Sequence, residues 1–110
     1  MNPYDSAHAL AAALKKSTEF QAFAQAFRRL KDDSTANSII EDFRRMQIEI
    51  QQLHIEGQEV PAEKEEKYKK LAEIANMNLV VKNYVEAEYR LAVLVGDIQR
   101  IIAEAIEVEK

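Results

Sequence analysis

Two histidines are the side chains most readily recruited for acid–base or metal chemistry in this sequence of 110 residues. His8 follows closely after Asp5, and His54 comes near the end of a long apolar pattern, where an imidazolium suits the negative end of a helix dipole. Neither belongs to an HExxH or ExxH pattern, the helical spacings that bring metal ligands onto one face. Both histidines are therefore predicted to lie at the surface.

Glu88 is the carboxylate whose surroundings most resemble those of a general acid, because it falls inside an apolar stretch next to Tyr84 and Leu91. A salt bridge or hydrogen bond across a helix interface is far more common for such a residue. Arg44 and Tyr68 are the candidate partners. We predict this structural role for Glu88.

Other chemistry is missing from the sequence. Cysteine is absent, which excludes disulfides and thiolate metal sites. The acidic stretch KDDSTANS lacks the central glycine and the final glutamate of an EF-hand loop. No glycine-rich phosphate loop and no Ser–His–Asp arrangement is recognisable. The prediction is a protein that is not an enzyme and that holds no cofactor and no metal.

Two arginine pairs are candidate partner contacts. Arg28 and Arg29 form the first pair, and Arg44 and Arg45 form the second. A nucleic-acid-associated module that uses these four side chains is the alternative function. The net charge of −4, with its acidic excess in residues 56–110, argues against general binding to phosphate backbones. Arg44 and Arg45 are instead predicted to contact a protein partner.

The elements that position these residues are predicted to be helices. Glycine and proline occur only twice each, too rarely for the turns of a sheet protein. The length suits one helical domain over residues 1–110. No uncharged run approaches the roughly 20 residues of a membrane span. The N-terminus lacks the pattern of a signal peptide. These observations favour a cytoplasmic protein.

About five helices are expected, arranged as an antiparallel hairpin or bundle. Asn2 is predicted to cap a helix over about 3–16, and Ser17 to cap a second helix that ends near 32–34. Phe20, Phe23, Phe27 and Leu30 mark the buried face of that second helix.

Two long helices are expected, over about 35–56 and 79–108. Gly57 supplies the left-handed residue after the first of them, and Pro61 is predicted as the first residue of a charged helix over 61–76. Asn78 is predicted to cap the last helix.

The last helix carries apolar residues in a heptad pattern of alternating four- and three-residue steps. One seam position is filled by Val80, Ala87, Leu94, Ile101 and Val108, and the other by Tyr84, Leu91, Ile98 and Ala105. Thirty helical residues span about 45 Å, whereas a compact domain of this length is only about 35 Å across. The stretch LAVLV at 91–95 therefore needs a partner on a second side. Gly96 marks either a close helix contact or a solvated face.

Self-association through the last helix is the resulting prediction, as a two-fold dimer or a higher homo-oligomer. The residues predicted to carry it are Leu91, Leu94, Val95, Ile98, Ile101 and Ile102.

The stretches FRRMQIEIQQLHIEGQEVP and NLVVKNYVEAEYRLAVLVGDIQRII resemble the YlbF/YmcA family of small bacterial helical proteins, and within it the YheA-like branch. The matching residues are Phe43, Arg44, Gln47, Gly57, Asn78, Tyr84, Ala87 and Glu88. Leu79 departs from the family pattern, which often has proline there.

The resemblance implies an all-helical, self-associating protein with a regulatory role in bacterial development or RNA processing. Iron–sulfur clusters occur on cysteines in some complexes of the family, and this chain has none to carry them. A non-enzymatic adaptor or regulator is therefore the leading functional prediction.

Overall fold

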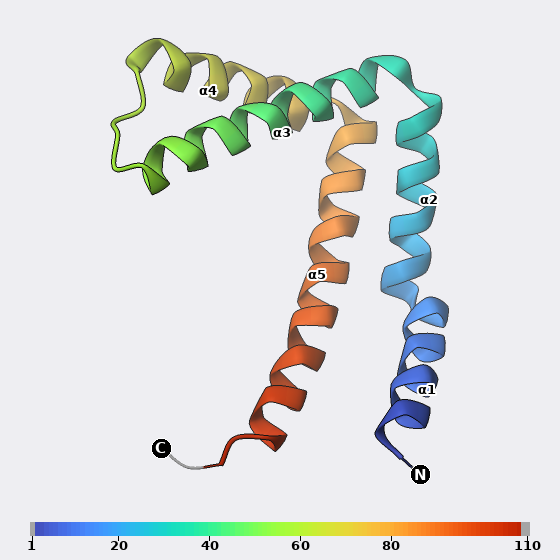
Figure 1. Cartoon of the computed structure of the whole chain (residues 1–110). Helices are drawn as coiled ribbons and strands as arrows, with labels where there is room; N and C mark the ends of the chain where they lie inside the picture. Colours follow the sequence, from blue (N-terminus) through green and yellow to red (C-terminus); the bar gives the residue numbers. More distant parts are fainter. Residues whose placement is uncertain (1, 109–110) are drawn as a thin grey trace.

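The computed structural model describes residues 2–108, and this part of the chain consists of five α-helices without a strand (Figure 1). The helices are α1 Pro3–Lys16, α2 Thr18–Asp32, α3 Ser34–Ile55, α4 Ala62–Met77 and α5 Leu79–Ala105. The predicted all-α class and the number of helices are confirmed.

Four polar side chains cap helix N-termini, because each supplies an oxygen to a backbone N–H that has no partner within its helix. Asn2, Ser17 and Asn78 cap α1, α2 and α5 as predicted, at 2.9–3.1 Å from the capped nitrogens. Asp33 caps α3 by accepting from the N–H of Ala36 at 3.0 Å. The acidic stretch before α3 therefore serves as a helix start.

The turn between α3 and α4 is built on Gly57, whose φ of +73° lies in the left-handed region. The N–H of Gly57 bonds to the carbonyl of His54, and that of Gln58 bonds to Leu53, which is the Schellman pattern. Pro61 is the residue before α4 rather than its first residue, so that prediction is wrong by one position. Its carbonyl accepts the first helical bond, from Glu65, a role in which the missing N–H of proline has no cost.

Two arms and a head describe the shape of the molecule (Figure 1). One arm is α1 followed by α2, the other arm is α5, and the head is the hairpin of α3 and α4 across their upper ends. The radius of gyration is 18.3 Å and the extents are 55 × 40 × 16 Å. A compact domain of this length would have a radius of gyration near 13 Å. The expectation of a compact domain is therefore wrong, because the arms project from the head.

The core lies where the head meets the two arms. Its buried members come from all helices except α1 and are Leu30, Ala36, Ile40, Ala75 and Val81. Phe43 on α3 is half-buried, packs against this cluster and stacks on Tyr68 with ring centroids 5.4 Å apart. The stack ties α3 to α4.

The free end of α5 departs from prediction. The helix stops at Ala105, three residues before the predicted end at 108. α2 packs along α5, whereas the backbone of α1 does not come close to it. No basic side chain lies in the last turn of α5 to offset its carbonyl groups. Without packing or charge to hold it, the apolar pattern alone does not continue the helix.

Candidate interaction surface

A polar cluster joins the head to the α5 arm. Arg44 on α3 forms an ion pair and hydrogen bond with Glu88 on α5, and the hydroxyl of Tyr84 donates to the other Glu88 oxygen at 3.3 Å. The guanidinium carbon of Arg44 lies 5.8 Å from the centre of the Tyr84 ring. The bridging role predicted for Glu88, with Arg44 as partner, is confirmed.

Burial raises the pKa of Tyr84. Loss of hydration raises its pKa above the ordinary value of 10.0, and the negative charge of Glu88 raises it further, while the positive charge of Arg44 partly opposes this. The hydrogen bond to Glu88 also raises the pKa, because the phenol must keep its proton to donate it.

An aromatic cluster lies beside this polar cluster and consists of Phe23, Phe27 and Tyr84. The centroid of Tyr84 is 5.6 Å from that of Phe23 and 6.4 Å from that of Phe27, so the rings connect α2 to α5. Phe27 is nevertheless 41% exposed, with the ammonium of Lys31 at 5.3 Å from its ring centre. The cluster therefore has one face inside the molecule and one face open.

The open face of Phe27 continues into a corner groove of about 460 Å³ between α2 and α3. Apolar side chains from both helices line it, including Ile40 and Ile48, and Ile48 is 63% exposed. Lys31 and Arg45 stand on the same groove. Glu41 lines the groove too, and Arg45 is paired with Asp42, so this apolar groove carries charges of both signs at its rim.

The four arginines that were candidates for nucleic-acid binding differ in their exposure and in their ion pairs. Arg44, predicted as a contact for a protein partner, is half-buried and paired with Glu88 within the chain. Arg45 lies 3.3 Å from Asp42 on its own helix. Arg28 and Arg29 are exposed on α2. With the two pairs on different helices and two members neutralised, the arrangement does not favour the alternative of nucleic-acid binding.

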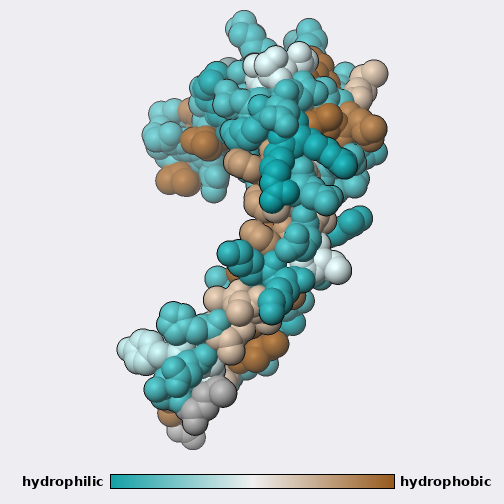
Figure 2. Space-filling view, turned by 90° about the vertical axis from the view of Figure 1, so that its right-hand side faces the viewer, coloured by the Kyte–Doolittle hydropathy of each residue, from teal (hydrophilic) through white to brown (hydrophobic). Residues whose placement is uncertain are grey.

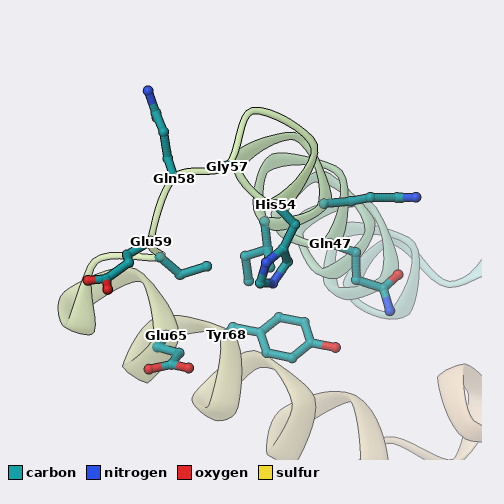
Figure 3. Close-up of a pocket in the computed structure, with 10 residues that line it drawn as sticks. Gln47, His54, Gly57, Gln58, Glu59, Glu65 and Tyr68 are labelled. Atoms are coloured by element: carbon teal, nitrogen blue, oxygen red, sulfur yellow. The ribbon is translucent and has the colours of Figure 1, made fainter.

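A second groove, of about 900 Å³, opens between the end of α3 and the start of α4 (Figure 3). The rings of His54 and Tyr68 point toward each other across it, whereas Gln58 points away. His54 is exposed, as predicted, and so is His8. Glutamine and glutamate side chains line the rest of the groove together with Ile50 and Val60.

The residues predicted to mediate self-association fall into two groups. Leu91, Leu94, Val95 and Ile98 are half-buried, whereas Ile101 and Ile102 are 63% and 51% exposed. Ile106, beyond the end of α5, is 74% exposed. Figure 2, which views the molecule from the side of α1 and α2, shows hydrophobic groups at intervals along that arm and on the head, between hydrophilic ones. The first group thus packs in part within the chain, while the second lacks cover.

The structure also places Gly96 on α5, for which the sequence left two readings open, and Ile48 on α3, which the sequence analysis did not single out. Gly96 is exposed, and a Cβ atom built on it would meet nothing within 4 Å, so within one chain it marks a solvated face. Ile48 was not singled out as a surface residue, although it is offset from the apolar row of α3. Its departure from the three- and four-residue spacing was the available signal.

Two classes of site are not found in residues 2–108. No group of three or more His, Asp or Glu side chains is placed to hold a metal ion there. Within the same range, no helix combines the length and hydropathy needed to cross a membrane.

Comparison with known proteins identifies the family. The model described as "Control of competence regulator ComK, YlbF/YmcA" matches residues 4–107. The chain belongs to the YlbF/YmcA family. A UPF0342 protein from Halothermothrix orenii is 36% identical over 105 residues, covering 96% of this chain and 89% of that protein.

Solved structures show the same YlbF/YmcA fold. A protein of unknown function (DUF964) from Bacillus stearothermophilus matches with a TM-score of 0.80 at 19% identity, covering 94% of this chain and 90% of that one. yheA from Bacillus subtilis matches at 0.68 with 24% identity and 96% of both chains. RicA from Bacillus subtilis, solved in complex with RicF, matches at 0.67 with 21% identity, covering 94% and 91%. The predicted family and its YheA-like branch are confirmed.

Proposed function

We propose that this protein is a non-enzymatic regulator that works in the bacterial cytoplasm by helix-mediated association, first with a second copy of itself. The observation that carries the proposal is the group of exposed apolar side chains at and just beyond the C-terminal end of α5. Ile101, Ile102 and Ile106 are more than half exposed, and the neighbouring arm does not approach them closely. Apolar patches of this kind mark association surfaces.

Family membership supports the same proposal from an independent direction. The family model is described by its control of a competence regulator, which is a regulatory function. RicA, which shares the fold, was solved with another protein, RicF. A role as adaptor in a complex with a further protein is consistent with both findings.

Sedimentation velocity at micromolar concentration tests self-association directly. The chain mass is 12.6 kDa, and we expect the species in solution to be a multiple of it. Leu94→Asp should dissociate the assembly or unfold the chain, since it would place two charges in an apolar interface. Ile102→Asp separates these outcomes, because Ile102 is half exposed and the monomer can fold with aspartate there.

Asn83→Asp is the matched control for both variants, since it adds the same charge at an exposed position of α5. It should leave the assembly unchanged. A wild-type protein that sediments as a monomer of 12.6 kDa across the micromolar range would reject self-association.

Recovery of a tagged copy from its own host tests the adaptor role against the nucleic-acid alternative. A protein partner should stay bound at moderate salt and after nuclease treatment. Association through phosphate contacts would instead weaken steeply as salt rises. Loss of all bound protein after nuclease treatment would favour the alternative.

A further inference from the structure

Two features of the α5 arm are left partly open by the rest of the chain, and they lie on the same side of the helix. Tyr84, with the half-open aromatic cluster, is near the start of α5, and Ile102 is near its end. They are 18 residues apart, which is five turns at 3.6 residues per turn, so both side chains point in the same direction about 27 Å apart.

We infer that two copies of the chain pack their α5 arms antiparallel around a two-fold axis near Val93, so that Ile102 of each copy covers the aromatic cluster of the other. This inference rests on the proposed self-association and adds its register. Val93 is midway between Tyr84 and Ile102, and a two-fold axis there exchanges the two positions. In this arrangement, each copy uses its Ile102 to cover the aromatic cluster of the other copy, so both partly open features are covered in both chains.

The side chains between these two positions suit such a contact. Leu91, Val95 and Ile98 lie on the same face at spacings of four and three residues and are only half-buried by α2. In antiparallel register Leu91 meets Val95 of the second copy, and Ile98 lies beside Glu88. The carboxylate of Glu88 already has Arg44 and Tyr84 as partners, so covering it leaves no unpaired charge.

The arm below the head is a single layer, with α2 beside α5 (Figure 1). A helical domain buries its apolar stripes by packing one layer on another. Because α3 and α4 cross only the upper ends of the arms, they do not provide a second layer along the lower part. A second copy of the chain provides this second layer for the first copy, and the first copy does the same for the second. The two α5 arms have the same length, so they fit side by side in opposite directions.

Charge favours the antiparallel direction over the parallel one. The C-terminal end of α5 carries the negative end of the helix dipole and no basic residue in its last turn. In the inferred register this end meets the corner groove of the second copy, where the Lys31 ammonium stands on the rim; Glu41 lines the same groove, and Arg45 there is already paired with Asp42. Ile106 then faces an apolar groove of about 460 Å³ that includes Phe27 and Ile48.

Site-specific crosslinking tests the register, and the absence of cysteine gives a clean background. Ala92 and Ala103 are both exposed on α5 and are 11 residues apart, about three turns, so they lie on nearly the same side. Ala92 is next to the two-fold axis, so its two copies come together. Ala103 is ten residues from the axis, so its copies are about 30 Å apart.

The full-length Ala92→Cys variant should form a covalent dimer with a short bis-maleimide reagent, and Ala103→Cys should not. Adding Ile102→Asp to Ala92→Cys should reduce crosslinking about tenfold or more, because it replaces an anchor of the interface by a charge. Ile55→Asp, at an exposed isoleucine of the head, should leave crosslinking unchanged.

The outcomes separate the register from self-association itself. Equal crosslinking at both cysteines would indicate a parallel arrangement and overturn the inference. Absence of crosslinking at Ala92→Cys in a protein that sediments as a dimer would also overturn it, while leaving self-association intact. Monomers in sedimentation would reject the proposed function and the register together.

Discussion

The head and the free ends of the arms use similar side chains with opposite results. Leu30, Ile40 and Val81 are buried where the head meets the arms, because three or four helices converge there. At the other end α1 has no buried residue, and from Ile101 to Val108 every side chain of the α5 arm is exposed. Burial in this fold therefore depends on how many helices meet at a given place, and not on how apolar each helix is.

Truncating one side chain in each region should give the largest difference in stability between the head and the free end of α5. Leu30→Ala removes a side chain that is 2% exposed, so the free energy of unfolding should fall by about 2–5 kcal/mol at any protein concentration. Ile102→Ala should lower stability only where the protein self-associates, and the effect should vanish on dilution. Thermal melts across a wide range of protein concentrations measure both.

Concentration-independent destabilisation by Ile102→Ala would mean that Ile102 packs within its own chain. An unchanged melting temperature for Leu30→Ala would mean that the core at the head is not the main source of stability.

Substituting the two glycines compares the same two regions, with a smaller expected effect on stability. Gly57→Ala in the head forces a residue with a Cβ into positive φ, which costs roughly 1 kcal/mol. Gly96→Ala in the arm meets nothing within 4 Å and should raise stability by up to about 1 kcal/mol, since alanine favours a helix. Chemical denaturation of both variants, at one protein concentration, should show a lower free energy of unfolding for Gly57→Ala and a higher one for Gly96→Ala. Destabilisation by Gly96→Ala would show that another backbone comes close to this position.

The cluster that joins the two regions should give the smallest effect in the monomer. Arg44 and Glu88 are both partly exposed, so Arg44→Ala should lower the stability of the monomer by only about 0.5–1 kcal/mol. If the second copy covers this pair, the same variant should cost more in the assembled protein, where Glu88 is left without its partner. Arg45→Ala, whose partner Asp42 is on the same helix, is the control.

The ionisation of Tyr84 gives a second test of the cluster that joins the head to the α5 arm. Its pKa is raised in the folded chain, so the stability it contributes is complete below about pH 10 and is lost as pH rises through the raised value. Glu88→Gln removes a charge that raises the pKa, so the phenol should titrate at lower pH. Ultraviolet absorbance titration, with Tyr84→Phe subtracted to isolate this residue, measures the shift. An unchanged titration would show that burial alone sets the pKa.

Several features of the fold were predictable because they depend on a few neighbouring residues. Asn2, Ser17 and Asn78 begin helices since a short polar side chain reaches the free N–H groups of the first turn. Gly57 ends α3 since glycine tolerates positive φ. The bridging role of Glu88 followed from a charged residue in an apolar row, and the resemblance identified the family without reference to any contact.

Other features were decided only by tertiary structure. Ile48 and Phe27 define a groove because α3 crosses α2 at a particular angle, which no local pattern specifies. Leu94 and Ile101 occupy the same heptad position, yet Leu94 is half-buried and Ile101 is exposed. The reason is that α2 covers α5 at the level of Leu94, whereas no other helix in residues 2–108 packs closely over α5 at the level of Ile101. A heptad determines which face of a helix is apolar, and the physical presence of a neighbour decides which part of that face leaves water.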